Sequence, residues 1–196
     1  CRLTTQLGEE VSVSLRGGLA YHLFLSHCWA LGGTQDQMRV IKMRLTEMLP
    51  DLHIFLDVDD LASGRGVEYV DVSQCIVVCV AEQYFSSVNC MRELLRAVCM
   101  QKRILTLVES EQTHGALRSD ALLQLLHQAE SCYSRWGLDA EVIGWQLRPQ
   151  LPTAAELHRL LTDEQWTIEW SRLLPYQDVT LRLLIERSGL AASVSA

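Results

Sequence analysis

Short continuous apolar runs alternate along the chain with longer segments in which apolar residues recur every three or four positions. The runs are bounded by glycine, proline or polar residues, as is typical of buried strands, whereas the longer segments have the period of amphipathic helices. The runs predict five strands, near residues 21–26, 53–57, 75–80, 103–109 and 167–170. Such apolar strands in alternation with helices predict a parallel sheet covered on both faces, which is an α/β fold.

The order of these elements predicts a flavodoxin-like three-layer architecture. The region 110–166 is too long for a connecting loop and has further helical periodicity, so we expect a helical elaboration before the last strand. We expect one domain over residues 21–188, preceded by a lead-in or linker over residues 1–20 and followed by a frayed tail over residues 189–196.

One predicted helix carries a carboxylate beside its apolar face. The stretch "SSVNCMRELLRAV", residues 86–98, offers the core an apolar stripe of Cys90, Leu94, Ala97 and Val98. Glu93 lies on the border of that stripe, about one turn into a helix for which we take Asn89 as the N-cap. A carboxylate there can simply complement the helix dipole, so its position alone does not assign a function.

Open parallel sheets bind ligands outside the carboxyl ends of their strands. The segments "SHCW", "DVDDLASG" and "AEQYFSSVN" follow the first three predicted strands. The sequence therefore predicts that these three segments meet at one edge of the sheet and form the ligand site.

Composition excludes several classes of function. The 196 residues carry a formal net charge of −7, and no basic cluster is longer than "QKR" at residues 101–103, so we expect no nucleic-acid partner. The longest apolar run, residues 76–81, is far shorter than a membrane span, so we expect no direct membrane insertion. The first residues lack the pattern of a signal peptide.

The seven cysteines do not have the spacing of a metal site. No pair of them is separated as C-x2-C, which zinc sites commonly use, and their number is odd. We therefore expect no metal and no resident cofactor. Free, mostly buried thiols in a reducing compartment are favoured over disulfides, so we expect a cytoplasmic protein.

The run "FLDVDDL" resembles the start of a phosphoaspartate phosphatase, with Asp57 as nucleophile and Asp59 as acid. Leu61 stands where such enzymes carry threonine, and no later strand ends in the paired acids that hold magnesium. A solvated acidic turn at the end of a strand is the favoured interpretation.

Four motifs in order resemble the Toll/interleukin-1 receptor (TIR) domain family. They are "HLFLSH", "IFLDVDDLASG", "YFSSVNCMRELLRAV" and "IEWSRLLPYQDVTLRLL". The phrase S-x-N-C-x-x-E-L is similar to a segment of the plant immune-receptor TIR domains and of the animal axon-degeneration NADase. The resemblance covers residues 21–109 and 168–187, and leaves out the lead-in and the region 110–165.

The resemblance implies an enzyme of the NAD-cleaving type, with NAD as substrate rather than cofactor. The glutamate that such members require matches Glu93, the expected catalytic residue. Seven residues are expected to contact NAD: Ser26, His27, Trp29, Asp57, Leu61, Ala62 and Cys90. Asn89 stands where the plant proteins carry tryptophan, so we expect Trp29 to supply the stacking surface.

Two hypotheses of function follow from this resemblance. The first is a signalling NAD+ nucleosidase that works when self-assembled, and the second is a non-catalytic TIR module that acts through TIR–TIR association. In the family, residues 57–66 correspond to the mobile BB loop, and its two glycines and polar side chains lead us to expect mobility and a role in self-association.

Overall fold

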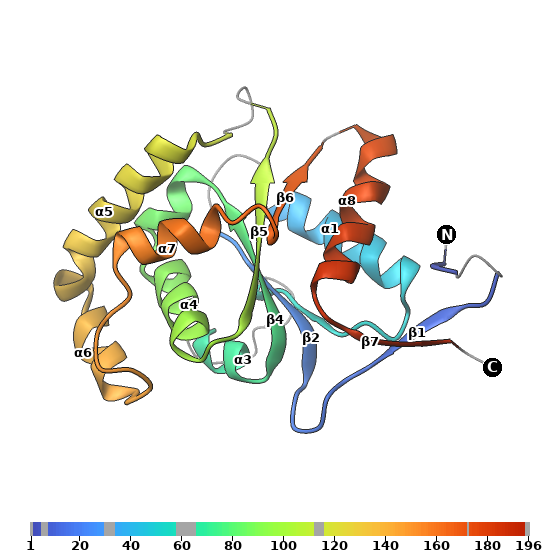
Figure 1. Cartoon of the computed structure of the whole chain (residues 1–196), viewed down its shortest axis with the longest axis horizontal. Helices are drawn as coiled ribbons and strands as arrows, with labels where there is room; N and C mark the ends of the chain where they lie inside the picture. The colour runs from blue at the N-terminus through green and yellow to red at the C-terminus, as the bar shows by residue number, and fades with distance from the viewer. Residues whose placement is uncertain are drawn as a thin grey trace.

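A five-stranded parallel sheet crosses the middle of the molecule (Figure 1). The computed structural model describes residues 2–4, 8–29, 34–57, 66–111, 116–171 and 173–194. The strands are β2 (Tyr21–Ser26), β3 (Ile54–Phe55), β4 (Ser73–Val80), β5 (Arg103–Glu109) and β6 (Thr167–Trp170). Their order across the sheet is β3-β2-β4-β5-β6, and every neighbouring pair is parallel. The predicted parallel sheet of flavodoxin-like order is confirmed.

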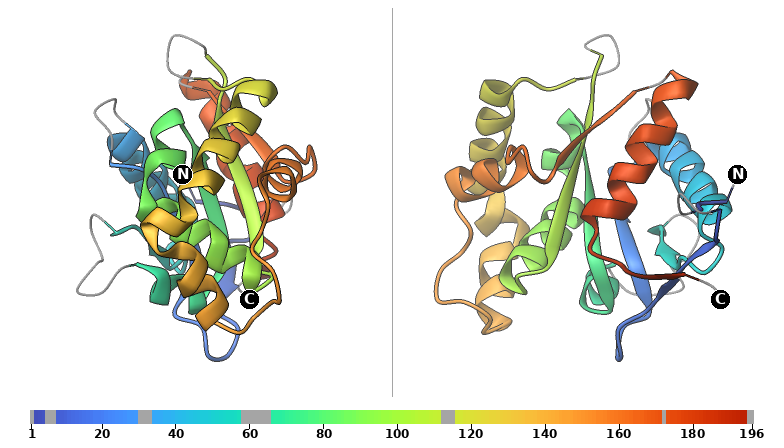
Figure 2. Two further views of the ribbon diagram at one scale, coloured as in Figure 1. Left: turned by 90° about the vertical axis from the view of Figure 1, so that its left-hand side faces the viewer. Right: turned by 45° about the vertical axis from the view of Figure 1, so that its right-hand side comes forward.

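Helices cover both faces of this sheet, as Figures 1 and 2 show. Helices α1 (Thr34–Met48) and α8 (Leu174–Arg187) pack on one face. The other face carries α3 (Val67–Asp71), the short 3-10 helix η1 (Glu82–Ser86), α4 (Val88–Cys99) and the helices that lie between β5 and β6 in the chain. Within the described part of the chain, none of the helices combines the length and the apolar character needed to cross a membrane.

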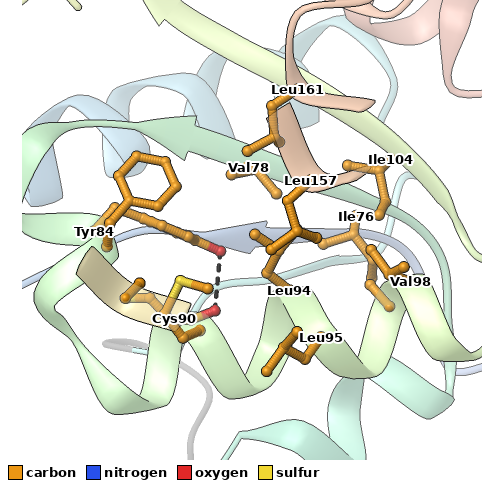
Figure 3. Packing of buried hydrophobic residues seen from close by; sticks show 14 of the residues in the cluster. Ile76, Val78, Tyr84, Cys90, Leu94, Leu95, Val98, Ile104, Leu157 and Leu161 are labelled. Carbon is orange, nitrogen blue, oxygen red and sulfur yellow. Dashed lines mark hydrogen bonds between the residues drawn. The ribbon is translucent and has the colours of Figure 1, made fainter. Parts of the chain in front are cut away.

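Strand β4 is apolar from Cys75 onward because it is buried from both sides. Successive side chains of a strand point to opposite faces of the sheet. Cys75, Val77 and Cys79 therefore pack toward α1 and α8, whereas Ile76 and Val78 pack toward α4. Figure 3 shows the second set against Leu94 and Val98 of α4, Ile104 of β5, and Leu157 and Leu161 of α7 (Ala154–Leu161).

The region before the last strand forms the predicted helical elaboration. It contains α5 (Ser119–Trp136), α6 (Leu138–Gly144) and α7 (Ala154–Leu161). Gly137, at a φ of 71°, ends α5 and begins α6, a left-handed conformation that glycine adopts without steric cost. The elaboration extends the core on the α4 face: Leu122 and Leu126 of α5 and Leu157 of α7 are buried there.

The two ends of the chain differ from the sequence-based expectation of a linker and a frayed tail. Strand β1 (Val11–Ser14) pairs antiparallel with β7 (Ala191–Val194), so both ends form a small second sheet at the side of the molecule (Figure 1). Val13 is buried against the core beneath α1 and α8, which anchors this sheet. Pattern analysis missed the pair because each strand has four residues and its partner lies at the other end of the chain.

Candidate active site

Side chains from three neighbouring strands meet at the carboxyl edge of the sheet. Ser26 ends β2, Asp57 follows β3, and Tyr84 lies in η1, just after β4. Because β3, β2 and β4 are adjacent and parallel, their carboxyl ends lie together. This is the edge at which open α/β sheets bind ligands.

Helix α4 begins at this edge, with a cap different from the one expected. Ser87 is the N-cap, and its Oγ accepts a hydrogen bond of 3.4 Å from the backbone N–H of Cys90. The assignment of Asn89 as N-cap is therefore wrong: Asn89 lies inside the helix, where its Oδ1 accepts from Arg92 Nη1 at 2.6 Å. Glu93 consequently lies in the second turn, where the helix dipole acts on it more weakly than in the first.

Glu93 lies inside the core rather than on the border of the apolar stripe. The residue is only 5% exposed. Its Oε2 is hydrogen-bonded to Ser26 Oγ at 2.6 Å, and Ser26 Oγ lies 2.7 Å from the Tyr84 hydroxyl. That hydroxyl donates to the backbone carbonyl of Cys90 at 3.2 Å, the bond drawn in Figure 3. A buried carboxyl group is thus linked through two hydroxyls to the backbone of its own helix.

Burial changes the protonation of Glu93. It raises the pKa of this carboxyl from its ordinary value to about 8, and the nearby charge of Asp57 also raises it. The hydrogen bond with Ser26 and the charge of Arg92 act in the opposite direction. Arg92 is engaged elsewhere, because its Nε donates to both carboxylate oxygens of Glu141 at 2.9 and 2.8 Å. Glu93 is therefore mostly neutral at pH 7, and a strongly shifted acid at the ligand edge of a sheet is characteristic of functional sites.

The segment of residues 57–66 reaches Glu93 from both of its described ends. Asp57 acts on Glu93 through its charge. Gly66 has a φ of 85°, and a Cβ atom built on it would lie 3.0 Å from Glu93 Oε1. Residues 58–65 lie outside the described part of the chain, and with them the predicted site residues Leu61 and Ala62.

Asp57 connects two further predicted site residues. It accepts a hydrogen bond of 2.7 Å from Trp29 Nε1, and its Oδ1 lies 3.7 Å from Nδ1 of the buried His27. Trp29 is 64% exposed, so most of its indole is open to solvent. A large aromatic ring in this position can stack on a planar ligand without any change in the core.

Cys90 lines the site and does not act as a nucleophile. Its Sγ donates a weak hydrogen bond of 3.3 Å to the carbonyl of His27. Burial and the neighbouring Glu93 raise the pKa of this thiol well above its ordinary value. The thiol therefore stays protonated, and the thiolate that nucleophilic catalysis requires does not form.

The structure thus brings together six of the eight predicted site residues: Ser26, His27, Trp29, Asp57, Cys90 and Glu93. Sequence analysis missed Tyr84 and Gly66. The segment that contains Tyr84 is predicted to lie at this edge. The apolar pattern, however, does not show whether the side chain of Tyr84 only packs its ring in the core or also hydrogen-bonds through its hydroxyl. Gly66 is the last residue of the predicted loop, and nothing in the sequence around it predicts a contact with Glu93.

The site is closed in this arrangement. Glu93 is buried beneath Gly66, so a ligand reaches the carboxyl only if the covering groups move. A cavity of about 590 Å³ lies elsewhere, at the amino-terminal edge of the sheet, where Lys102, Arg103 and Trp166 form part of its wall. None of the six described site residues lines that cavity.

Comparison with known proteins identifies the fold. No protein-family model and no curated protein matches the chain. Among solved structures, the chain is similar to the TIR domains in the structure of the activated Roq1 resistosome directly recognizing the pathogen effector XopQ. The TM-score is 0.52 at 13% sequence identity, over 85% of this chain and 98% of that one. This likeness shows that the chain has the TIR fold.

Proposed function

We propose that this chain is a signalling domain with NAD+ nucleosidase activity, which cleaves the nicotinamide–ribose bond of NAD when copies of it self-assemble. The observation that carries the proposal is the environment of Glu93. This carboxyl is buried, is hydrogen-bonded to Ser26 and through Ser26 linked to Tyr84, and lies at the ligand edge of a TIR fold. In sequence it matches the glutamate that NAD-cleaving members of the resembled family require.

One carboxylate is enough for this reaction because of the leaving group. The nicotinamide ring of NAD is cationic, so when its bond to the ribose breaks, it departs as a neutral base with the bonding electrons and needs no general acid. The ribose becomes oxocarbenium-like, and a carboxylate beside it stabilises that charge and orients the sugar hydroxyls. When water is the acceptor, it adds to the ribose carbon, loses a proton and yields ADP-ribose.

The other site residues would bind the substrate rather than react with it. Trp29 offers an exposed ring for stacking, and Ser26 and His27 lie at the end of β2, beside Glu93 and Asp57. The predicted contacts of NAD with Asp57, Cys90, Leu61 and Ala62 belong to the same proposal.

Self-assembly is a reasonable trigger because the site of a single copy is closed. Asp57 and Gly66 both act on Glu93, so a contact that displaces residues 57–66 would change the charge and the access of this carboxyl together. The similar Roq1 structure is of an activated resistosome. We infer that association through residues 57–66 opens the site in this chain as well.

We infer further that this signalling takes place in the cytoplasm. No disulfide joins any of the six described cysteines, and five of them are buried. Free thiols in this number are typical of proteins from a reducing compartment. A role in innate immunity would agree with the resistosome similarity.

The second candidate is a TIR module without enzymatic activity that acts only by docking to other TIR domains. The observation that favours it is the state of Glu93, which is 5% exposed and mostly neutral, whereas stabilisation of an oxocarbenium needs an accessible carboxylate. Loss of the family's tryptophan at Asn89 points in the same direction.

Incubation of the concentrated chain with NAD, followed by chromatography of the products, separates the two candidates. The nucleosidase proposal expects release of nicotinamide, and a loss of at least ~10²-fold in Glu93→Gln, which keeps the shape and removes the charge. Glu186→Gln, an exposed glutamate of α8, is the matched control and should keep full activity. A well-folded, concentrated wild type that releases no nicotinamide would establish the docking module instead.

A further inference from the structure

Three contacts between oxygen atoms connect Glu93 to the backbone of α4. Glu93 Oε2 lies 2.6 Å from Ser26 Oγ, Ser26 Oγ lies 2.7 Å from the Tyr84 hydroxyl, and that hydroxyl lies 3.2 Å from the Cys90 carbonyl oxygen. All four residues are buried, and each is at most 5% exposed. In such an environment a contact between two oxygens is stable only if a proton lies between them.

The protons available to these three oxygen–oxygen contacts can be counted. The Cys90 carbonyl can only accept, so the Tyr84 proton points toward it, and Tyr84 then accepts from Ser26. The single proton of Ser26 is thereby used. The remaining contact, between Ser26 and Glu93, is then a hydrogen bond only if Glu93 carries a proton and donates it to Ser26. The alternative, in which Ser26 donates to Glu93 Oε2, belongs to the ionised carboxylate. With Glu93 ionised, two protons serve three contacts, and one contact is left without a proton.

We propose that Tyr84 is a positioning residue of this site, which acts through Ser26 to hold Glu93 in its protonated form in the resting chain. Its meaning for catalysis rests on the function proposed above. Ionisation of Glu93 would reverse the direction of these hydrogen bonds. Ser26 would donate to Glu93, Tyr84 would donate to Ser26, and the contact of Tyr84 with the Cys90 carbonyl would be lost. Tyr84 therefore couples the charge of the catalytic carboxyl to the arrangement of η1 and α4.

The strongest influence on Glu93, its burial, favours a proton on it. Burial is the largest cause of its raised pKa, and the charge of Asp57 adds to it. Arg92 is the cation that opposes this effect, but its guanidinium is hydrogen-bonded to Glu141 and Asn89. Among the described residues, the groups that face Glu93 are Ser26 of β2, Asp57 after β3, Tyr84 of η1, Cys90 and Arg92 of α4, and Gly66 before α3.

The proposal is tested by titration of Glu93 in the full chain, through carbon-13 NMR of labelled glutamate side chains. The Glu93 resonance is identified by its loss in Glu93→Gln. In Tyr84→Phe we expect the titration midpoint to fall by about one pH unit, because the Ser26 proton loses its acceptor and turns to the carboxylate. In Ser26→Ala we expect the midpoint to rise, because the carboxylate loses its hydroxyl donor.

Tyr133→Phe is the matched control. Tyr133 is also buried in the α4-side core, and within the described residues its hydroxyl has no hydrogen-bond partner. Its removal should leave the Glu93 midpoint unchanged. General loosening of the core would move the midpoint in the same direction in all three variants, whereas the proposal requires opposite shifts in Tyr84→Phe and Ser26→Ala.

The pH profile of nicotinamide release supplies the second measurement. In Tyr84→Phe it should shift to lower pH by the same amount as the midpoint. A midpoint in Tyr84→Phe that equals or exceeds that of the wild type overturns the role of Tyr84, even if NAD is cleaved. The expected opposite shifts in a chain that releases no nicotinamide support the role of Tyr84 in holding the proton and reject the nucleosidase function.

Discussion

The backbone of Gly66 lies directly against the carboxyl group of Glu93. A Cβ atom at Gly66 would be 3.0 Å from Glu93 Oε1, tighter than about nine in ten real Cβ contacts, and the residue has a φ of 85°. Glycine is needed here for two reasons: the left-handed backbone and the absence of a side chain. The end of the predicted loop thus covers the group proposed to act on NAD.

Gly66→Ala should therefore destabilise the chain by more than its backbone conformation alone explains. Gly137→Ala is the matched control, because Gly137 has a φ of 71° and a Cβ atom there would meet no other described residue within 4 Å. We expect about 1–2 kcal/mol for the control and a larger loss for Gly66→Ala, measured by urea denaturation. Equal losses would mean that the contact with Glu93 is energetically unimportant.

The buried carboxyl predicts an unusual dependence of stability on pH. Between its ordinary pKa of 4.5 and its folded-state value of about 8, the native chain holds a proton on Glu93 that the unfolded chain has released. The free energy of unfolding therefore falls as pH rises through this window, by up to about 1.4 kcal/mol per pH unit from this one group.

Glu93→Gln removes this contribution, since the amide is neutral at every pH. Urea denaturation at pH 5, 6, 7 and 8 should show that the difference in stability between the variant and the wild type moves steadily in favour of the variant as pH rises. Glu186→Gln, at an exposed position, serves as the control and should follow the wild type. Parallel curves for Glu93→Gln and wild type would mean that Glu93 is ionised in the folded chain.

If self-assembly opens the site, activity per molecule depends on protein concentration. Nicotinamide release per chain should rise steeply over a hundredfold range of concentration, in parallel with the mass measured by sedimentation. Glu93→Gln should assemble over the same range without gaining activity, which separates association from catalysis. Constant specific activity across the series would count against opening by assembly.

Trp29 should affect the binding of NAD more than the chemical step. Its ring is 64% exposed and held by a hydrogen bond from its Nε1 to Asp57, so its loss leaves the core intact. In Trp29→Ala we expect KM to rise about tenfold, the scale of one lost stacking contact, with kcat much less affected. Trp29→Phe keeps an aromatic face and should retain most of the affinity. An unchanged KM in Trp29→Ala would exclude this ring as the stacking surface.

The sequence by itself determined the sheet and the edge at which the site is formed. Buried parallel strands must be apolar along their whole length, so runs such as that of β4 are visible without any knowledge of their neighbours. The same reasoning placed Ser26, Asp57 and the start of α4 at one edge, because parallel strands end on the same side. A helical period also placed Glu93 next to the apolar stripe of α4.

Only the tertiary structure decided what stands opposite Glu93. Ser26 is 67 residues away from Glu93 in sequence, and 58 away from Tyr84, so no local pattern predicts that their oxygen atoms meet. Periodicity tells which face of a helix a side chain occupies, but burial, and with it protonation, depends on the surfaces that close over that face. The pairing of β1 with β7 has the same cause, since it joins two short segments from opposite ends of the chain.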